Sequence, residues 1–227
     1  MNRISILVTV LLVLTLSCVA LAQEDEETGD ILEITLSGGM AIPMSGLADW
    51  QTGFDLEDQP EIVDRAPNNG WDIGIDVGYF INPKLIVGLN FTYTAFGIDT
   101  DVDLDHRHRL FSPALYGKYY FEGETNLVPY VKASVGLENA KFSTFVENPG
   151  GRRFREISYD PTLFYAAALG LFYYTADYSG VFIEADYKMA SAESTESVYL
   201  DDTYLFGENI AVLQINFGVR LLVGSGD

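Results

Sequence analysis

Two histidines lie close together in the segment His106–Arg109, and they are the only histidines in the chain. A histidine beside a serine and an acid can act as the general base of a hydrolase that removes acyl groups from lipids. The next serine along the chain, Ser112, follows four residues after His108. In an extended strand four residues span roughly 13 Å, which is too long for a hydrogen bond between the two side chains. Because the sequence also contains no phosphate-binding loop, dinucleotide fingerprint or nucleophile elbow, we expect no enzymatic activity and no cofactor.

Four aspartates at alternate positions form a second group with possible ligand chemistry. Alternate residues of an extended segment share one face, and carboxylate oxygens are preferred ligands of Ca²⁺ and Mg²⁺. No glycine supplies the sharp turn of a dedicated calcium loop, so each carboxylate can equally be solvated, and no firm metal site is predicted. These candidates for a divalent cation are Asp99, Asp101, Asp103 and Asp105.

The elements that must position these residues are predicted to be β-strands with one apolar face. From Trp71 to Tyr79 the residues of one parity are apolar, and those of the other parity are aspartate or glycine. That period of two is typical of a strand, but no amphipathic helix accompanies the strands to cover their apolar faces. Lipid outside and polar side chains inside would satisfy the pattern, so we expect an all-β fold, an eight-stranded antiparallel up-and-down transmembrane β-barrel. The eight expected strands are Ile31–Ile42, Trp71–Phe80, Leu85–Ile98, Arg107–Phe121, Leu127–Ala140, Tyr159–Tyr174, Val181–Met189 and Asn209–Val223.

The connections between the expected strands alternate in length. Outer-membrane barrels have short turns on the periplasmic side and longer loops outside, so both chain ends are expected on the periplasmic side. Aromatic residues of the outward parity also fall near the strand ends, as in the two aromatic girdles of a membrane barrel. The expected short turns are Ile81–Lys84, Glu122–Asn126 and Thr175–Gly180, and the expected outer loops are Pro43–Gly70, Asp99–His106, Lys141–Ser158 and Ala190–Glu208.

Three prolines fit this strand assignment poorly, because a closed barrel has no free edge to hide a missing N–H group. Pro129 and Pro161 are near strand ends, whereas Pro113 lies well inside the fourth expected strand. We therefore expect a β-bulge at Pro113 or a later start of that strand.

Charged residues are expected to line the barrel interior. Six acids and four bases share the inward parity, a balance that argues against a strongly selective pore. An eight-stranded barrel is just wide enough for its own side chains to fill it, so we expect an ion-pair network; a proton or ion path and a binding pocket remain alternatives. We expect Arg220 to bridge Glu33 and Glu184, and Lys118 and Lys132 to share an acid such as Asp76. The expected network is Glu33, Asp72, Asp76, Lys118, Lys132, Glu138, Glu184, Asp186, Lys188 and Arg220.

The start of the chain has the pattern of a secretory signal peptide, with Arg3, an apolar stretch too short to span a bilayer, and a small-residue cleavage site ending at Ala22. We therefore expect a cleaved signal peptide (1–22), a mobile acidic lead-in (23–30), the barrel (31–223) and a short tail (224–227). Lipoprotein processing at Cys18 is an alternative, although Thr15 stands where such signals usually have leucine. Without Arg3 the chain has 12 basic and 33 acidic residues, a net charge of −21, which argues against nucleic-acid binding. Since Cys18 is the only cysteine, disulfides, thiol catalysis and cysteine zinc sites are excluded from the mature chain.

Three segments carry a resemblance to a known family: Ser112–Phe121, Val128–Gly136, and Gly170–Tyr174 followed by Val181–Tyr187. In these segments the chain resembles the small eight-stranded outer-membrane barrels of the OmpA/OmpX/OmpW-like group. The last expected strand is also similar to the signal read by the barrel-assembly machinery, although Val223 stands where an aromatic residue is common and Gly224–Asp227 follow it. The residues that match this signal are Asn216, Gly218, Leu221 and Val223.

The resemblance implies a location and partners. We expect a monomer in the bacterial outer membrane, in contact with membrane lipid and lipopolysaccharide and handled by periplasmic chaperones and the barrel-assembly machinery during biogenesis. Arg107 and Arg109 fit a contact with lipid phosphates at the outer rim, and Asp99–Asp105 would bridge to lipopolysaccharide phosphates through divalent cations. The predicted function is non-enzymatic, an envelope-structural and surface-contact role; the alternative is a narrow channel for small or hydrophobic solutes, as suggested for OmpW-like relatives.

Overall fold

The structure is a computed structural model of the 227-residue chain. It describes residues 32–44, 47, 67–97, 107–121, 125–148, 151–176, 178–194 and 206–224. The segments predicted as signal peptide and acidic lead-in, and the four aspartates Asp99, Asp101, Asp103 and Asp105, lie outside these residues. The described residues form nine strands: β1 Leu32–Pro43, β2 Gly70–Asn82, β3 Leu85–Gly97, β4 Arg107–Tyr120, β5 Leu127–Asn148, β6 Gly151–Ser158, β7 Thr162–Ala176, β8 Ser179–Ser194 and β9 Phe206–Val223.

Eight of these strands close into a barrel. Neighbouring strands pair in the order β4-β3-β2-β1-β9-β8-β7-β5, and a further pairing of β4 with β5 completes the ring. All the pairings are antiparallel, and Leu32 at the start of β1 lies opposite Val223 at the end of β9. The predicted eight-stranded antiparallel up-and-down barrel is therefore confirmed.

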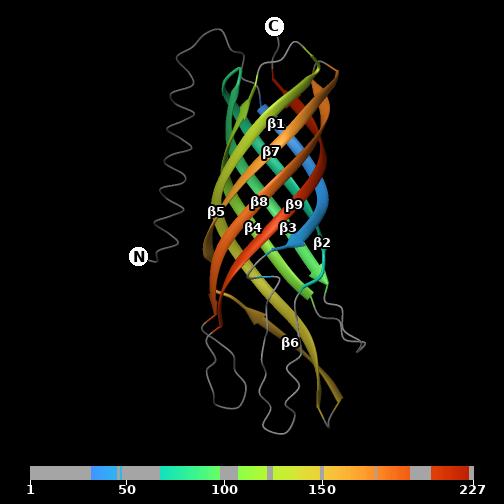
Figure 1. Cartoon of the computed structure of the whole chain (residues 1–227), viewed down its shortest axis with the longest axis vertical. Coiled ribbons are helices and arrows are strands. Elements are labelled where there is room, and N and C mark those ends of the chain that lie inside the picture. The colour runs from blue at the N-terminus through green and yellow to red at the C-terminus, as the bar shows by residue number, and fades with distance from the viewer. Residues whose placement is uncertain are drawn as a thin grey trace.

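The two ends of the barrel differ. The connections β2–β3, β4–β5 and β7–β8 lie at the end where β9 finishes, which we call the turn end; we call the opposite end the loop end (Figure 1). At the turn end, the side chain of Asn82 accepts hydrogen bonds from the backbone N–H groups of Lys84 and Leu85, at 2.9 and 3.0 Å. The Asn82 side chain takes the place of a backbone carbonyl in this tight turn, so both N–H groups have a hydrogen-bond acceptor.

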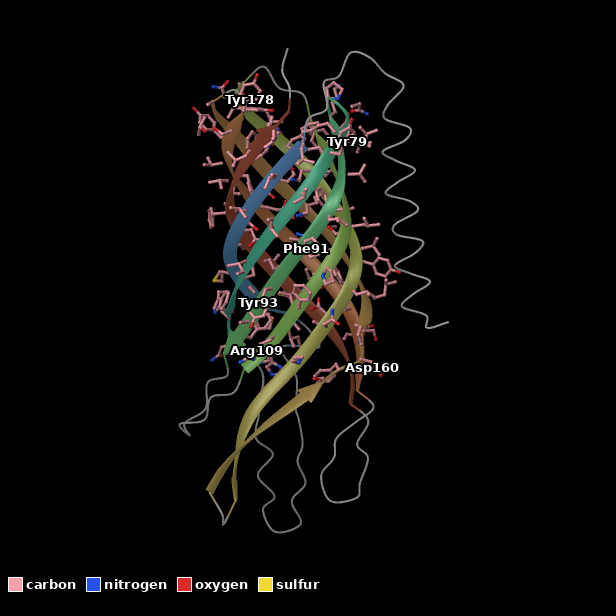
Figure 2. All side chains as sticks on the ribbon, turned by 180° about the vertical axis from the view of Figure 1, so that it is seen from behind. Tyr79, Phe91, Tyr93, Arg109, Asp160 and Tyr178 are labelled. Carbon is pink, nitrogen blue, oxygen red and sulfur yellow. The ribbon has the colours of Figure 1, made fainter. Side chains whose placement is uncertain are left out.

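The outer surface of the barrel is apolar. Residues of the outward parity on every barrel strand are exposed, including Ile73 at 55 % and Leu169 at 68 % of their possible area. Aromatic side chains flank this surface: Trp71 packs on Tyr93 with ring centres 5.7 Å apart, and Tyr119 packs on Phe121 at 5.3 Å. Figure 2 shows Tyr79 and Tyr178 at the turn end, Phe91 midway, and Tyr93 and Arg109 towards the loop end. An exposed apolar band between two aromatic girdles is the surface of a barrel surrounded by lipid.

Two expected loops are partly strand. Lys141–Ser158 was predicted as an outer loop, but β5 continues to Asn148 and pairs with β6, with Phe145 opposite Phe154. Likewise β8 extends to Ser194 and β9 begins at Phe206. The β5–β6 hairpin protrudes beyond the barrel at the loop end (Figure 1). In these extensions two strands pair through backbone hydrogen bonds, and such pairing does not require an apolar face. The alternation of apolar and polar residues therefore did not predict them.

Pro113 causes neither of the irregularities that the sequence predicted. β4 begins at Arg107, and its register with β5 is the same on both sides of Pro113, with Phe111 opposite Asn139 and Ala114 opposite Gly136. The side-chain amide of Asn139 donates to the carbonyl of Phe111 at 3.3 Å. A Cβ atom on Gly136 would lie 2.2 Å from the carbonyl oxygen of Pro113, so the glycine allows the two backbones to approach where the proline has no N–H to donate. Pro161 precedes β7, which begins at Thr162 rather than at Tyr159 as predicted.

Candidate functional site in the barrel lumen

The lumen is filled by side chains, and its charged residues lie between two apolar clusters and among the rings of the cluster at the turn end. A cluster of apolar and aromatic residues closes the turn end, with Phe80, Val128, Tyr174 and Phe182 packed around it. We call it the turn-end cluster; its buried members are Ile86, Tyr116, Tyr120, Tyr130 and Phe172.

A second apolar cluster fills the loop end of the lumen. It contains small and large side chains from β1, β3, β4, β5, β7, β8 and β9, so that it spans the barrel cross-section. We call it the loop-end cluster; its buried members are Ala41, Leu47, Phe96, Leu110, Ala114, Ala140, Tyr159, Phe164, Ala190, Ile210 and Val212. The lumen therefore holds apolar clusters at both ends in addition to the charged residues that the sequence predicted inside it.

Two lysines face each other in the charged layer and share a carboxylate. Lys118 on β4 lies directly opposite Lys132 on β5. The Nζ atom of Lys132 is 3.0 Å from Asp76 and 3.3 Å from Glu184, whereas that of Lys118 is 2.5 Å from Glu33 and 3.9 Å from Asp76. Like charges directly opposite each other on one face repel, and the shared acid from β2 offsets that repulsion. The structure thus brings Lys118, Lys132 and Asp76 together, as the sequence predicted.

Arg220 sits at the boundary between the charged layer and the turn-end cluster. Its Nε atom is 3.0 Å from Glu33, and its Nη2 group donates to the Tyr174 hydroxyl at 3.4 Å. The hydroxyl of Tyr120 donates to the same glutamate at 2.8 Å. A guanidinium over aromatic faces is held by cation–π attraction as well as by its charge partner. The guanidinium carbon lies over the rings of Phe172, Tyr120, Tyr174 and Phe80, at 4.2, 4.7, 5.4 and 5.8 Å.

Half of the expected bridge at Arg220 is wrong. Arg220 lies opposite Gly180 on β8, while Glu184 lies opposite Asn216 and pairs with Lys132 instead. The sequence predicted that Glu184 and Arg220 have similar heights because each was counted from an expected strand end. Since β8 begins at Ser179 rather than Val181, Glu184 is farther into the barrel than that count implied.

The serine that was considered as a nucleophile belongs to the charged layer. The Ser112 hydroxyl lies 3.0 Å from both carboxylate oxygens of Glu138, and Lys188 donates to Ser112 at 2.8 Å. Lys188 and Glu138 also form an ion pair at 2.7 Å. Ser112 is 1 % exposed and His108 is 2 % exposed, so both lie inside the wall of the barrel. A substrate acyl group therefore has no open route to this serine.

Asp72 and Asp186 differ from the other inward acids, because neither forms an ion pair among the described residues. Asn216, with its amide nitrogen turned towards Asp72, donates to Asp72 Oδ1 at 2.6 Å. Asp186 Oδ1 is buried and has no hydrogen-bond partner within the part of the chain that the structure describes. It borders a cavity of about 10 Å³, which is the size of one water molecule. The cavity is lined by Asn90, Thr92, Ser112, Ser134, Phe164, Ala166, Asp186, Lys188 and Gln214.

The residues of the expected assembly signal occupy both faces of β9. Asn216 and Gly218 face the lumen, while Leu221 and Val223 are exposed at 49 % and 52 %. A Cβ atom on Gly218 would lie 2.4 Å from the carbonyl oxygen of Leu36 and 2.5 Å from the Phe182 ring. This glycine is therefore required by the packing of the lumen, whatever reads the strand during assembly. Recognition by the assembly machinery stays a prediction.

Sequence reasoning missed the neutral residues that complete the lumen. The aromatic residues around Arg220 and the polar residues beside the acids have the same inward parity as the charged residues. Parity was therefore the only feature of the sequence that could have predicted that they line the lumen. Asn90 donates to Asp76 at 2.5 Å, and Gln214 donates to Thr94 at 3.0 Å. Among the residues that the structure describes, no group of acidic, histidine or cysteine side chains has the arrangement of a metal site. No helix in the same described residues has the length and apolar character of a membrane span.

Comparison with known proteins gives matches of structure only, since the sequence matches no protein-family model and no curated protein. The outer membrane protein OprG from Pseudomonas aeruginosa matches with a TM-score of 0.50 and 16 % sequence identity, over 87 % of this chain and 99 % of that chain. Neisserial surface protein A matches with a TM-score of 0.48 and 16 % identity, over 86 % and 97 %. The outer membrane protease OmpT from Escherichia coli matches with a TM-score of 0.43 and 12 % identity, over 86 % and 96 %.

At these identities the comparison bears on the fold and leaves the activity open. The closed ring of eight strands, the short turns at one end and the exposed apolar band agree with the match to OprG over nearly its whole length. The chain has the fold of the small eight-stranded β-barrels of the bacterial outer membrane.

Proposed function

We propose that this chain is a non-enzymatic integral protein of the outer membrane that serves as a structural element of the envelope and presents its loop end to the surroundings. One observation carries the proposal: the described lumen is filled along its length. The charged layer is held by ion pairs such as Lys132–Asp76 at 3.0 Å and Lys188–Glu138 at 2.7 Å. Apolar clusters cover that layer on both sides.

A filled lumen argues against the alternative of a channel. A conducting path needs polar groups or water from one end to the other, and the turn-end and loop-end clusters interrupt any such path. The cavity of about 10 Å³ beside Asp186 has room for a single water molecule and not for a column of water or a solute. A filled eight-stranded barrel is instead suited to hold a chain in the membrane and position its loops.

A burial argument supports the absence of enzymatic activity. The serine that is nearest to the histidine pair, Ser112, has its hydroxyl between Glu138 and Lys188 and is buried. The Lys188 ammonium group lies between Glu138, at 2.7 Å, and the Ser112 hydroxyl, at 2.8 Å, and is itself buried. Purified protein incubated with labelled lipid A should therefore release no fatty acid, and steady hydrolysis would contradict this part of the proposal.

Conductance through planar bilayers tests the filled lumen directly. The refolded protein should give no stable unitary openings. A variant that truncates one ring in each apolar cluster, Phe164→Ala with Phe172→Ala, should give openings because those clusters interrupt the path. Phe91→Ala with Phe217→Ala removes the same bulk from the outward face of the barrel and should stay silent. Stable openings of the unaltered protein would overturn the structural role in favour of the channel.

A further inference from the structure

The small cavity beside Asp186 has a mostly polar wall. Its volume is about 10 Å³, and its lining residues come from six strands, β3, β4, β5, β7, β8 and β9. Seven of its nine lining residues are polar, and only Phe164 and Ala166 are apolar. Cavities with apolar walls stay dry in proteins, whereas a polar cavity of this size holds one water molecule if two to four polar groups can bond it. The wall of this cavity therefore has the chemistry of a hydration site.

One atom of the wall needs a hydrogen-bond donor. Asp186 Oδ1 is buried and has no hydrogen-bond partner in the part of the chain that the structure describes. A buried carboxylate oxygen without a hydrogen bond is costly, because it has lost its contacts with bulk water. Asp186 lies opposite Ala168 on β7 and Gln214 on β9, and the Gln214 amide donates to Thr94 instead, at 3.0 Å. The cavity is therefore the place from which a donor can reach Oδ1.

Lys188 has a donor to spare on the same cavity. An ammonium group carries three N–H donors. The Nζ atom of Lys188 is 2.7 Å from Glu138 and donates to Ser112 at 2.8 Å, which leaves one donor for a molecule in the cavity that Lys188 lines. A water molecule there can accept from Lys188 and donate to Asp186 Oδ1. Such a bridge is nearly as favourable as a direct hydrogen bond.

A third group of the lumen also reaches the cavity. The Thr92 hydroxyl donates to the side-chain oxygen of Asn90 at 3.1 Å, and so its own oxygen can still accept a hydrogen bond. Asn90 in turn donates to Asp76 at 2.5 Å. The second hydrogen of a water molecule in the cavity can therefore reach Thr92. That bond would connect the residues around Asp76 with those around Lys188.

The wall favours a neutral occupant over a cation. The Lys188 ammonium group lines the cavity and would repel a second positive charge at this distance. Among the described residues, no group of acidic, histidine or cysteine side chains has the arrangement of a metal site. A molecule that has one heavy atom, accepts one hydrogen bond and donates two matches both the volume and the partners, and water is that molecule.

We propose that this cavity is the binding site of one ordered water molecule, which accepts a hydrogen bond from Lys188 and donates to Asp186 and Thr92. The water turns Lys188 and Asp186, which form no direct ion pair, into a water-mediated one. It also joins hydrogen-bonded groups from β2, β3, β4, β5 and β8 into a single network inside the barrel. The proposal goes beyond the structural role, because it assigns a bound molecule to the filled lumen.

Water-edited solid-state NMR of the labelled protein in lipid bilayers tests the site, because it measures the transfer of magnetisation from water to individual side chains. The methyl group of Ala166 and the β-carbon of Ser134 line the cavity and should receive magnetisation. Ala114 is the matched control, since it is 5 % exposed, belongs to the loop-end cluster and does not line the cavity.

Three results of this measurement would overturn the proposal. Absence of transfer to both Ala166 and Ala114 would show a dry cavity. Equal transfer to both would show a hydrated lumen, and this result would contradict the proposed structural role as well. A shift of the Asp186 carboxyl carbon when sodium is replaced by N-methylglucamine would assign a metal cation to the cavity in place of water.

Filling the cavity gives a second, independent test. Ala166→Val adds two methyl groups at the cavity wall, expels the water and leaves Asp186 without a donor, so the unfolding equilibrium constant at a fixed urea concentration should rise roughly 10- to 100-fold. Ala167→Val adds the same groups to the exposed outward face and should leave the constant unchanged. Equal constants for the two variants would overturn the proposal.

A second substitution separates loss of the water from crowding. Asp186→Leu keeps a side chain of similar shape but removes the oxygen that needs the donor. Combined with Ala166→Val, it should recover most of the lost stability. A double variant that is no more stable than Ala166→Val would show that crowding alone caused the loss, and would contradict the water bridge.

Discussion

Lys118 and Lys132 lie directly opposite each other inside the barrel, and Asp76 on a third strand lies between their charges, 3.9 Å from the first and 3.0 Å from the second. Breaking a buried ion pair from one side is costly, because the remaining charge is left without its partner in a region of low polarity. This relationship makes Asp76 the residue on which the charged layer depends most.

Asp76→Asn should therefore lower the free energy of unfolding by about 3–5 kcal/mol, since both lysines lose a carboxylate. Asp72→Asn is the matched control, because Asp72 contacts the amide of Asn216 rather than a cation. Urea unfolding in lipid vesicles, followed by tryptophan fluorescence, measures the two variants. Equal losses for Asp72→Asn and Asp76→Asn would contradict the assignment of the shared carboxylate.

Glu33→Gln should destabilise the barrel more than Arg220→Met does. Glu33 pairs with both Lys118, at 2.5 Å, and Arg220, at 3.0 Å, so its loss leaves Arg220 without a carboxylate and Lys118 with only the more distant Asp76, at 3.9 Å. Loss of Arg220 leaves Glu33 with Lys118 and with the hydroxyl of Tyr120, and removes mainly cation–π contacts worth about 2 kcal/mol. The same unfolding measurement ranks the variants, and a larger loss in Arg220→Met would show that the aromatic contacts outweigh the ion pairs.

Gly218→Ala should lower the unfolding free energy by about 1–3 kcal/mol, because its Cβ atom would collide with the backbone at Leu36 and with the Phe182 ring. Gly117→Ala is the control, since the nearest atom to a Cβ there is 4.0 Å away. Refolding into vesicles without any assembly machinery isolates packing from recognition. If Gly218→Ala refolds as stably as Gly117→Ala, the glycine serves recognition rather than packing.

Much of the fold was predictable because one face of every barrel strand meets lipid. Outward apolar parity is continuous along strands such as β3 and β7, and the starts of β3, β4 and β5 at Leu85, Arg107 and Leu127 agree with those predicted. The parity also placed the ten charged residues inside the barrel, where all but Asp186 are buried and Asp186 is half-buried with an enclosed Oδ1 atom.

The pairing of those charges was less predictable, because it depends on the stagger between strands. A strand pattern gives the face of a residue but not its height relative to a neighbouring strand, so Glu184 was assigned to Arg220 when it pairs with Lys132. The aromatic contacts of Arg220 were missed for a related reason. Aromatic residues lie on both faces of β4, with Tyr119 outside and Tyr120 inside, and the pattern alone does not say which of them pack together.

The central claim, that the chain crosses the outer membrane with its turn end in the periplasm and its loop end outside, is tested most directly by cysteine labelling on intact cells. In a Cys18→Ser background, Ser158→Cys and Ser191→Cys place a thiol at exposed positions of the loop end, and Pro83→Cys and Asn126→Cys place one at exposed positions of the turn end. An impermeant thiol reagent should label the first two variants on intact cells, and the second two only after the outer membrane is disrupted. Labelling of Pro83→Cys and Asn126→Cys alone on intact cells would invert the orientation, and equal labelling of all four after disruption only would contradict insertion across the outer membrane.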